Sequence, residues 1–274
     1  MTAVEVPSAF DVIEIEINSR CNRRCGYCPV SLEPRPAVPA QMPDEVFRRI
    51  AADLAAMSFT GRISYHFYNE PLLRRDLERL VAELRHAAPG ALQVLYTNGD
   101  RLTDERHRGL VRAGVDAFIV TAHDDQAVPD RPLQWVQTGS TLKLTNRAGR
   151  LVHLPTPTAL ISRTPCFAPT DMLIVTVTGD VVLCYEDSER SEVMGNVLEL
   201  GLMTIWTSPR FVAMRQALQQ GRRRDASALC ARCTNVAHTF AGSAVVDEPF
   251  SATGQALTRQ ELRARSDVVR RAQP

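Results

Sequence analysis

The sequence predicts an α/β protein in which a parallel sheet with crossover helices is followed by a smaller module of a β-hairpin and a helix. Strand-like and helix-like segments alternate through the first half of the 274 residues. From Asp171 the pattern changes to two apolar runs around a turn, which is typical of a hairpin. The alternation alone leaves two arrangements open, a doubly wound sheet and a barrel.

The elements of the first half are recognised by apolar residues at strand or helix spacing. Pro43 opens the first predicted helix, Thr103 is the expected N-cap of the third, and Gly114 ends it. The predicted strands cover residues 12–18, 63–68, 94–97 and 117–121, and the predicted helices cover residues 44–57, 76–86 and 103–114.

The first two predicted strands alternate between an apolar and a polar face, because successive side chains point to opposite sides of a strand. Helices should cover the apolar face, so we expect the polar face to line the interior, where a ligand would bind. The alternative is that these polar groups pair with one another or with water at an open edge. The polar set comprises Glu14, Glu16, Asn18, Ser64, His66, Tyr68 and Glu70.

The second half begins with a hairpin centred on residues 178–180. A helix is expected to begin near Ser208 and Pro209. After Asn235 the chain is polar and rich in arginine, which fits either a loose tail or a packed terminal helix. We therefore divide the chain into a sheet-and-helix domain at 1–150, a hairpin-and-helix domain at 151–240 and a C-terminal tail at 241–274.

The seven cysteines fall into a set of three and a set of four. Cys21, Cys25 and Cys28 have the spacing C-x3-C-x2-C directly after the first strand, and three thiolates can hold three corners of a [4Fe–4S] cluster while one iron stays open. In a cytosolic chain such spacings indicate metal binding more than disulfides. The other four, which would fully ligate a second cluster or a structural Zn²⁺ ion, are Cys166, Cys184, Cys230 and Cys233.

The cysteine triplet after a strand resembles the radical S-adenosylmethionine (SAM) superfamily. In that family SAM chelates the open iron, and an electron from the cluster breaks the sulfonium bond to release a 5′-deoxyadenosyl radical. The resemblance implies an incomplete (β/α) TIM-like barrel for the first domain. It also implies that the other four cysteines hold an auxiliary [4Fe–4S] cluster in a twitch module, the shortened form of a SPASM domain.

Several motifs resemble the SAM-binding segments of the superfamily. Y-N-E-P at residues 68–71 corresponds to G-G-E-P, whose strand-end groups hold the amino group of SAM, and an asparagine stands where the second glycine is usual. T-N-G at residues 97–99 caps the third strand, although it would also suit an ordinary turn. An aromatic residue before the third cysteine matches a position near adenine, and a histidine after the fourth strand either contacts SAM or caps the sheet. The expected SAM-binding residues are Tyr27, Tyr68, Asn69, Glu70, Pro71, Asn98 and His123.

Further segments narrow the resemblance to the aminocyclitol dehydrogenases of the butirosin pathway and their carbohydrate-modifying relatives. They run from about residue 13 to 235 and include I-E-I-N-S-R-C-N-R-R-C-G-Y-C-P, G-R-I-S-Y-H-F-Y-N-E-P-L-L, L-T-N-R-A-G and M-G-N-V. The resemblance implies oxidation of a secondary alcohol of an aminocyclitol, sugar or aminoglycoside to a ketone, in antibiotic or other natural-product biosynthesis.

Alcohol oxidation by hydrogen abstraction gives the two clusters different tasks. Removing a hydrogen atom from the carbinol carbon makes the hydroxyl far more acidic, and loss of its proton leaves a strongly reducing radical anion whose electron the auxiliary cluster can accept. A proton acceptor is required within hydrogen-bond reach. The candidates are Glu186 and Arg147, although arginine is a poor base and would rather orient the alcohol. Tyr96 and Tyr185 are candidates for substrate contacts or ordinary core residues.

Three other functions stay open. A radical epimerase needs a hydrogen-atom donor, and all seven cysteines are already assigned as ligands, although a tyrosine could serve. An enzyme that modifies a ribosomal peptide often carries an N-terminal recognition domain, and only 20 residues precede Cys21. A non-catalytic iron–sulfur electron carrier or zinc-stabilised protein would not need the Y-N-E-P strand end.

The charge and hydropathy of the chain disfavour some partners. The net charge is +1, from 32 basic and 31 acidic residues. This charge balance gives no strong electrostatic attraction to nucleic acid or to an anionic membrane. No apolar run approaches the ~20 residues of a transmembrane helix, and the N-terminus lacks the regions of a signal peptide. We expect a cytoplasmic enzyme with a small polyhydroxylated substrate, and the resemblance implies a flavodoxin- or ferredoxin-type electron donor.

Overall fold

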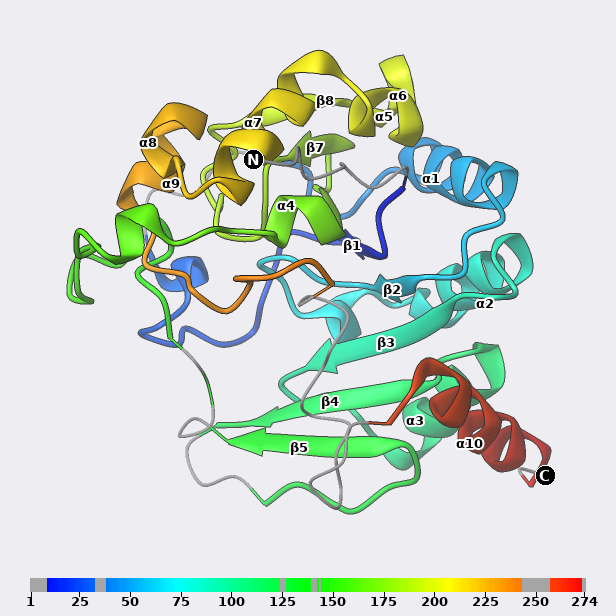
Figure 1. Cartoon of the computed structure of the whole chain (residues 1–274). Coiled ribbons are helices and arrows are strands. Elements are labelled where there is room, and N and C mark those ends of the chain that lie inside the picture. Colours follow the sequence, from blue (N-terminus) through cyan, green and yellow to red (C-terminus); the bar gives the residue numbers. More distant parts are fainter. Residues whose placement is uncertain are drawn as a thin grey trace.

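The computed structural model contains an eight-stranded sheet in the order β5-β4-β3-β2-β1-β6-β7-β8 (Figure 1). It describes residues 9–32, 38–123, 127–138, 142, 144–242 and 257–272. The strands are β1 (Val12–Ile15), β2 (Arg62–Ser64), β3 (Leu92–Thr97), β4 (Ala117–Ala122), β5 (Gln134–Thr138), β6 (Met172–Val175), β7 (Asp180–Val182) and β8 (Val193–Asn196).

Strands β1 to β6 all run parallel. β1 pairs with β2 on one side and with β6 on the other, and β3, β4 and β5 continue the sheet beyond β2. The β6–β7 hairpin and the pairing of β7 with β8 are antiparallel. Because β5 and β8 are separate edges, the sheet is open. This confirms the predicted incomplete barrel, and it joins the predicted hairpin to the same sheet.

Three helices cover one face of the parallel strands: α1 (Asp44–Ala56), α2 (Leu77–Ala87) and α3 (Asp104–Ala113). The starts of α1 and α3 and the end of α3 lie at the residues that the sequence predicts. Pro43 precedes α1, the Thr103 hydroxyl accepts a hydrogen bond from the Arg106 backbone N–H at 3.1 Å, and Gly114 ends α3 with φ of 128°.

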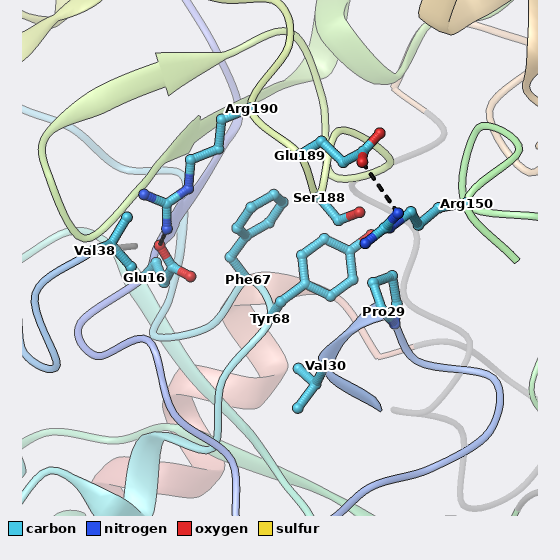
Figure 2. Close-up of a pocket in the computed structure, with 10 residues that line it drawn as sticks. All are labelled: Glu16, Pro29, Val30, Val38, Phe67, Tyr68, Arg150, Ser188, Glu189 and Arg190. Atoms are coloured by element: carbon cyan, nitrogen blue, oxygen red, sulfur yellow. Dashed lines mark hydrogen bonds and ion pairs between the residues drawn. The ribbon is translucent and has the colours of Figure 1, made fainter. Parts of the chain in front are cut away.

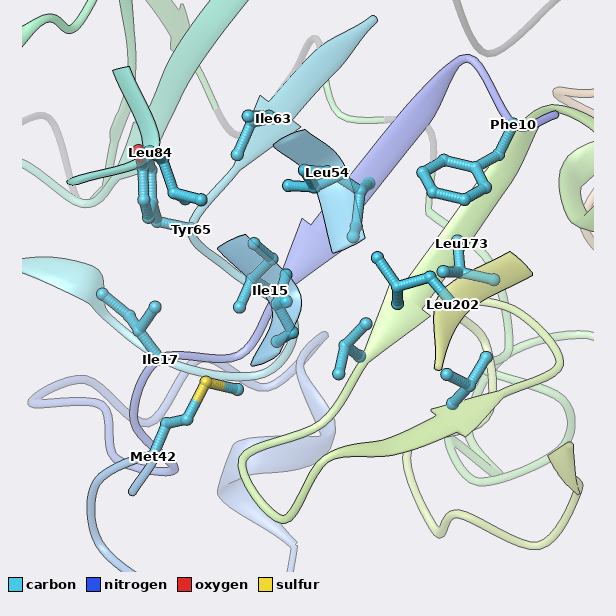
Figure 3. Packing of buried hydrophobic residues seen from close by; sticks show 14 of the residues in the cluster. Phe10, Ile15, Ile17, Met42, Leu54, Ile63, Tyr65, Leu84, Leu173 and Leu202 are labelled. Carbon is cyan, nitrogen blue, oxygen red and sulfur yellow. The ribbon is translucent and has the colours of Figure 1, made fainter. Parts of the chain in front are cut away.

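The main apolar core lies between these helices and the sheet (Figure 3). Ile13, Ile15 and Ile17 are fully buried in it, together with Leu54 from α1 and Leu84 from α2. The alternation of β1 therefore places its isoleucines under the helices and its acidic residues on the opposite, inner face.

The second half of the chain is built mainly from short helices around β6 to β8. Ser208 caps the longest of them, as predicted, and its hydroxyl accepts a hydrogen bond from the Phe211 N–H. In the described part of the chain, no helix is both long and apolar enough to cross a membrane. The helices are α4 (Ala168–Asp171), α5 (Val197–Leu200), α6 (Leu202–Trp206), α7 (Pro209–Gln219), α8 (Arg223–Ala226) and α9 (Ala228–Arg232).

The C-terminal residues form helix α10 (Arg259–Arg271), so of the two alternatives for the tail these residues adopt the packed helix. Thr258 and Glu261 form a capping box at its start. Leu262 packs on the inner face against residues of β3 and β4, and the Ser266 hydroxyl donates to buried Asp116 at 2.7 Å. Residues 243–256 of the predicted tail lie outside the described residues.

Four strands differ from prediction. The predicted strand at residues 12–18 ends at Ile15 as β1. Strands β5 and β8 were not predicted, because the half-exposed edge sequence Q-W-V-Q-T lacks an apolar run and V-M-G-N is very short. The predicted strand at residues 63–68 keeps its ladder pairing only to Ser64, after which the chain leaves the sheet. The proposed division at residues 150 and 240 stays a prediction.

Candidate active site

The carboxyl ends of β1 to β4 meet at one edge of the sheet, and each is followed by predicted site residues. The cysteine triplet follows β1, Glu70 follows β2, Asn98 follows β3 and His123 follows β4. Parallel strands bring these loops together, and this is the edge at which open α/β sheets bind their ligands.

Glu70 connects three of these loops. Its carboxylate accepts hydrogen bonds from the Leu72 N–H at 3.0 Å, the Thr97 hydroxyl at 2.7 Å and the Asn98 N–H at 2.8 Å. Its backbone N–H donates to the Arg20 carbonyl at 2.8 Å. Burial raises the pKa of Glu70, while the hydrogen bonds act in the opposite direction. Glu70 therefore fixes the loops around the site, with its carboxylate already engaged within the protein.

Asn69 stabilises the turn at which the superfamily motif usually has glycine. Its side-chain oxygen accepts from the Phe67 N–H at 2.8 Å, and its amide donates to the Tyr65 carbonyl at 3.3 Å. The neighbouring Tyr68 donates to the Tyr185 carbonyl at 2.6 Å. Pro71 is buried and begins a 3-10 helix at Pro71–Leu73.

The T-N-G turn holds the cysteine loop from the side of β3. The Asn98 amide donates to the Asn22 side chain at 3.0 Å and lies 3.9 Å from Cys21 Sγ. Gly99 has φ of 77°, and a Cβ atom there would lie 2.8 Å from a Val120 methyl. The glycine is therefore needed both for its conformation and for space.

Tyr27 and His123 meet although 96 residues separate them in sequence. The Tyr27 hydroxyl lies 2.6 Å from His123 Nδ1, and the same nitrogen lies 3.7 Å from Cys25 Sγ. The two residues were predicted separately, Tyr27 near adenine and His123 either at SAM or as a cap of the sheet, and the structure joins them beside the triplet. All three cysteines of the triplet are partly exposed.

Two predicted inner-face residues are satisfied within the protein, as the alternative reading of the polar face allows. The Glu16 carboxylate accepts from the Val177 N–H at 2.8 Å and forms an ion pair with Arg190 at 2.8 Å. The Asn18 amide donates to the Glu70 carbonyl at 3.0 Å. These two residues therefore support the framework of the site.

A cavity of about 280 Å³ lies beside the triplet loop (Figure 2). Pro29 and Val30 of that loop form one wall, and the Glu16–Arg190 pair lies at one side. Tyr68 lines the cavity and also lies 5.8 Å, ring centroid to guanidinium carbon, from Arg147. Tyr68 therefore links this cavity to the region around Arg147.

The other four cysteines come from separate segments and line one small cavity. Cys166 precedes α4, Cys184 follows β7, and Cys230 and Cys233 lie in and after α9. Burial raises the pKa of Cys184 well above its ordinary value and that of Cys230 to about 12. These thiols would stay protonated without a cationic partner, so the chemistry of the set suits a metal centre.

Four thiolates around one cavity can hold either a zinc ion or a [4Fe–4S] cluster. Among the residues that the structure describes, no three or more histidine, cysteine, aspartate or glutamate side chains converge closely enough to hold one metal ion. A tetrahedral zinc site would draw four sulfurs to about 2.3 Å from one point. Thiolates that bind the separate irons of a cubane do not converge on one point, so a cluster does not require such a convergence.

Glu186 lies beside this cavity and binds the other catalytic candidate, Arg147. Its Oε1 is 3.4 Å from Arg147 Nη1 and 2.9 Å from both the Thr145 hydroxyl and the Asn235 amide nitrogen. Tyr185 joins the network, because its hydroxyl contacts the Asn235 amide and lies 2.9 Å from His238 Nε2. The network spans the cavity of the four cysteines and the loop that carries Arg147.

Arg147 remains a cation in this environment. Burial alone lowers its pKa, but the electrostatic influence of Tyr68 and of the Glu186 carboxylate outweighs burial and raises the pKa above its ordinary value. A guanidinium that stays charged is a poor base, and the role of Arg147 in orienting the alcohol stays a prediction.

Tyr96, the third catalytic candidate, lies in a different cluster. Its hydroxyl accepts a hydrogen bond from Arg62 at 3.2 Å, and its ring centroid is 4.5 Å from that of His66. Arg62, Thr145, Asn235 and His238 were not identified from the sequence. Arg62 and Thr145 lie in segments that carry the resemblance, but no motif gives any of the four a role, and their contacts join residues that are far apart in the chain.

Two segments of the chain match known families. Residues 15–149 match the radical SAM superfamily, and residues 166–234 match the SPASM iron–sulfur cluster-binding domain. The S-adenosyl-L-methionine-dependent 2-deoxy-scyllo-inosamine dehydrogenase of Niallia circulans is 37% identical over 238 residues, which cover 83% of this chain and 94% of that protein. The chain belongs to the radical SAM superfamily.

Solved structures agree with this assignment. BtrN in complex with AdoMet and 2-DOIA superimposes with a TM-score of 0.77 at 34% identity, covering 91% of this chain and 99% of that chain. The enzyme anSMEcpe, at a TM-score of 0.51 and 11% identity over 94% of each chain, shares the fold. The GTP 3′,8-cyclase of Rhodococcus opacus (strain B4) is 34% identical over 112 residues, which are 40% of this chain and 31% of that protein.

The family resemblance read from the motifs is therefore confirmed. As a radical SAM enzyme with a SPASM-type domain, the chain uses SAM and two [4Fe–4S] clusters. The residues fit these groups. The triplet would supply three ligands at the carboxyl ends of the strands, and the other four cysteines, three of them buried, line a second site.

Proposed function

We propose that the chain is a SAM-dependent dehydrogenase that oxidises a secondary alcohol of an aminocyclitol to a ketone. The observation that supports this most is the Arg147–Glu186 ion pair, whose carboxylate belongs to the residue two positions after Cys184. An alcohol held at this pair would meet a cation, a proton acceptor and an electron acceptor at one place. The relative from Niallia circulans and the BtrN complex support the substrate class, because their names specify 2-deoxy-scyllo-inosamine and 2-DOIA.

When bound, the cofactors supply hydrogen-atom abstraction from the carbinol carbon and an acceptor for the last electron. The ketone then forms by loss of one hydrogen atom, one proton and one electron from the alcohol. The chain's own residues must bind the alcohol, take its proton and hold the carbinol carbon towards the carboxyl ends of the parallel strands.

Glu186 is the proposed proton acceptor. Its Oε1 carries the contacts with Arg147 and Asn235, whereas the hydrogen bond described for Oε2 is the one from the Thr145 hydroxyl at 3.0 Å. Oε2 therefore keeps lone-pair capacity for the substrate hydroxyl. Glu186 is 2% exposed, so water competes little for that position.

Arg147 is proposed to orient the alcohol and stabilise the developing alkoxide. Its guanidinium lies between the Glu186 carboxylate and the ring of Tyr68, which limits the positions it can take. A fixed cation aimed at the oxygen that gains negative charge stabilises the transition state more than the ground state.

SAM is proposed to bind at the carboxyl ends of β1 to β4, where it would contact the turn of residues 68–71, Asn98 and the Tyr27–His123 pair. The side chains of Glu70 and Asn69 are engaged inside the protein, so their role in the proposal is to fix the turn on which SAM binds. Tyr96 is proposed to contact substrate from the inner face.

The first cluster needs a one-electron donor of low potential. We expect a flavodoxin- or ferredoxin-type protein in this role and, because such donors and reduced clusters belong to a reducing compartment, a cytoplasmic location.

Anaerobic turnover with a panel of aminocyclitols and sugars, scored by mass, tests the proposal. We expect a product that has lost two hydrogens, with one 5′-deoxyadenosine formed for each ketone. A product of unchanged mass that has incorporated solvent deuterium would indicate an epimerase and overturn the proposal.

A further inference from the structure

A second group of polar residues lies on the inner face of the sheet, near the Arg147–Glu186 pair. We call it the inner-face cluster and define it by Glu14, Arg62, Ser64, His66 and Tyr96. Glu14 and Ser64 are register partners of β1 and β2, and the next strand contributes Tyr96. All five lie on the face opposite the isoleucines that pack under the helices.

Two members of the cluster have unused hydrogen-bonding capacity. Ser64 is fully buried, and within the described part of the chain its hydroxyl has no hydrogen-bond partner. The buried Nδ1 of His66 likewise lacks a partner among the described residues. Buried polar atoms are almost always paired, so an unpaired hydroxyl and an unpaired imidazole nitrogen at neighbouring positions indicate a bound polar group.

Glu14 supplies negative charge at the same place. Its side chain is 8% exposed, and its Oε1 lies 3.8 Å from His66 Nε2, which is beyond hydrogen-bond distance. Burial lowers the pKa of His66, so the imidazole is mainly neutral at pH 7 and does not neutralise the carboxylate. Glu16, one inner position further along β1, is paired with Arg190 instead. The Arg62 cation also acts on His66, but the ion contact found for Glu14 among the described residues is the one with His66, so Glu14 is the inner-face carboxylate that can take a cationic ligand.

The cluster is close to the region proposed for the reaction. His66 is two residues before Tyr68, whose ring lies beside the Arg147 guanidinium. Burial lowers the pKa of His238 to about 4 and the charge of Arg62 adds to this shift, while His238 contacts Tyr185 next to Glu186. A ring-shaped substrate between the two groups would reach both.

We propose that the inner-face cluster recognises the amine of the substrate. The ammonium group binds the Glu14 carboxylate and His66 Nδ1, a neighbouring ring hydroxyl binds Ser64, and the carbon to be oxidised then faces Arg147 and Glu186. This inference rests on the proposed function and assigns to it the selection of aminated over non-aminated cyclitols.

Ligand binding without turnover tests the inference. The protein is reconstituted with both clusters and SAM, left without reductant, and titrated by calorimetry with an aminocyclitol and with the matched cyclitol that carries a hydroxyl instead of the amine. Glu14→Gln should weaken binding of the aminocyclitol about 30-fold and that of the cyclitol less than about threefold. His66→Phe, which keeps a ring against Tyr96, should show the same selectivity loss to a smaller degree.

Glu16→Gln is the matched control, because it changes a neighbouring inner-face carboxylate that is already paired. It should leave the preference for the amine unchanged. Equal weakening of both ligands by Glu14→Gln and His66→Phe, or no weakening, overturns the inference. If wild-type protein oxidises cyclitols yet shows no preference for the amine, the inference also fails while the proposed dehydrogenase activity stands. If no cyclitol is oxidised in the mass assay, the proposed function itself fails.

Discussion

Arg147 and Ala148 both adopt positive φ angles, of 47° and 51°. Such angles are uncommon for residues other than glycine and carry a cost of about 1 kcal/mol or more each. The preceding residue fixes this turn, since the Asn146 amide donates to the Arg232 carbonyl at 2.8 Å and its backbone N–H donates to the Thr234 hydroxyl at 2.9 Å. The cysteine-bearing segment of α9 thus holds the backbone that directs Arg147 towards Glu186.

Replacing Arg147 should separate product formation from cofactor use. Arg147→Ala is expected to lower kcat/KM for ketone formation by about 100-fold, because it removes a fixed cation from the developing alkoxide. Arg147→Lys keeps the charge and should lose less. Steady-state assays should show that SAM binding persists and that 5′-deoxyadenosine forms in excess over product. Full activity of the alanine variant would remove Arg147 from the site.

The four cysteines of the second set lead to a prediction about iron content. Cys184→Ala should reduce the iron of reconstituted protein from about eight to about four atoms per chain while some SAM cleavage remains. Colorimetric iron analysis and Mössbauer spectra measure this directly. Unchanged iron in Cys184→Ala, with a loss instead in Cys21→Ala alone, would refute the auxiliary site.

The cysteines could be found from the sequence because ligand spacing is local, whereas the partners of Glu186 could not. Thr145 is 41 residues away from Glu186 and Asn235 is 49 residues away. Only the fold brings them together, and neither sits in a motif with a mechanism of its own. The contact between Arg62 and Tyr96 could not be predicted either, because it joins side chains of two neighbouring strands.

Among the elements, α10 depends on few contacts with the sheet. Leu262 is 1% exposed against β3 and β4, whereas Val268 on the same helix is 60% exposed. The buried face of α10 consists mainly of Leu262 and Ser266. The sequence therefore has no apolar stripe there that would distinguish a packed helix from a loose tail. Asp116 completes the attachment by contacting Ser266 and Arg270 of α10 and Arg85 of α2.

Leu262→Ala should therefore destabilise the protein by about 3 kcal/mol, through lost burial and the cavity left behind. Anaerobic urea unfolding measures the change. Val268→Ala, at an exposed site on the same helix, should cost less than about 0.5 kcal/mol. Equal effects of the two substitutions would show that α10 does not pack on the sheet in solution.

His107 joins α3 to the segment before β5 and should make stability depend on pH. Its Nε2 lies 2.9 Å from the Pro132 carbonyl, and burial lowers its pKa below the ordinary value of about 6.5. The unfolded chain then takes up a proton more readily than the folded chain. Stability is complete above about pH 6.5 and falls as the pH is lowered towards the folded pKa.

The measurement is the free energy of unfolding at pH 7.5 and at pH 5.5. His107→Gln should show a smaller fall between the two values than wild type, while His86→Gln, at an exposed position of α2, should match wild type. An identical fall in wild type and His107→Gln would exclude His107 as the source.

At the scale of the whole molecule, one open sheet carries both halves of the proposed reaction. The ends of β1 to β4 gather the triplet and the SAM-binding turns, and the β6–β7 hairpin, joined to β1, brings Cys184 and Glu186 to the same sheet. The β/α alternation predicted the parallel core, because each strand and helix there has a clear apolar period. Edge strands β5 and β8 were missed, since edges need few apolar residues.

Transfer of the carbinol hydrogen tests the central claim most directly. A substrate deuterated at the carbon to be oxidised is turned over anaerobically, and both products are analysed by mass spectrometry. A SAM-dependent dehydrogenase predicts deuterium in 5′-deoxyadenosine and a ketone that lacks it, in equal amounts. Deuterium retained in the organic product, or 5′-deoxyadenosine that carries none, would contradict the account.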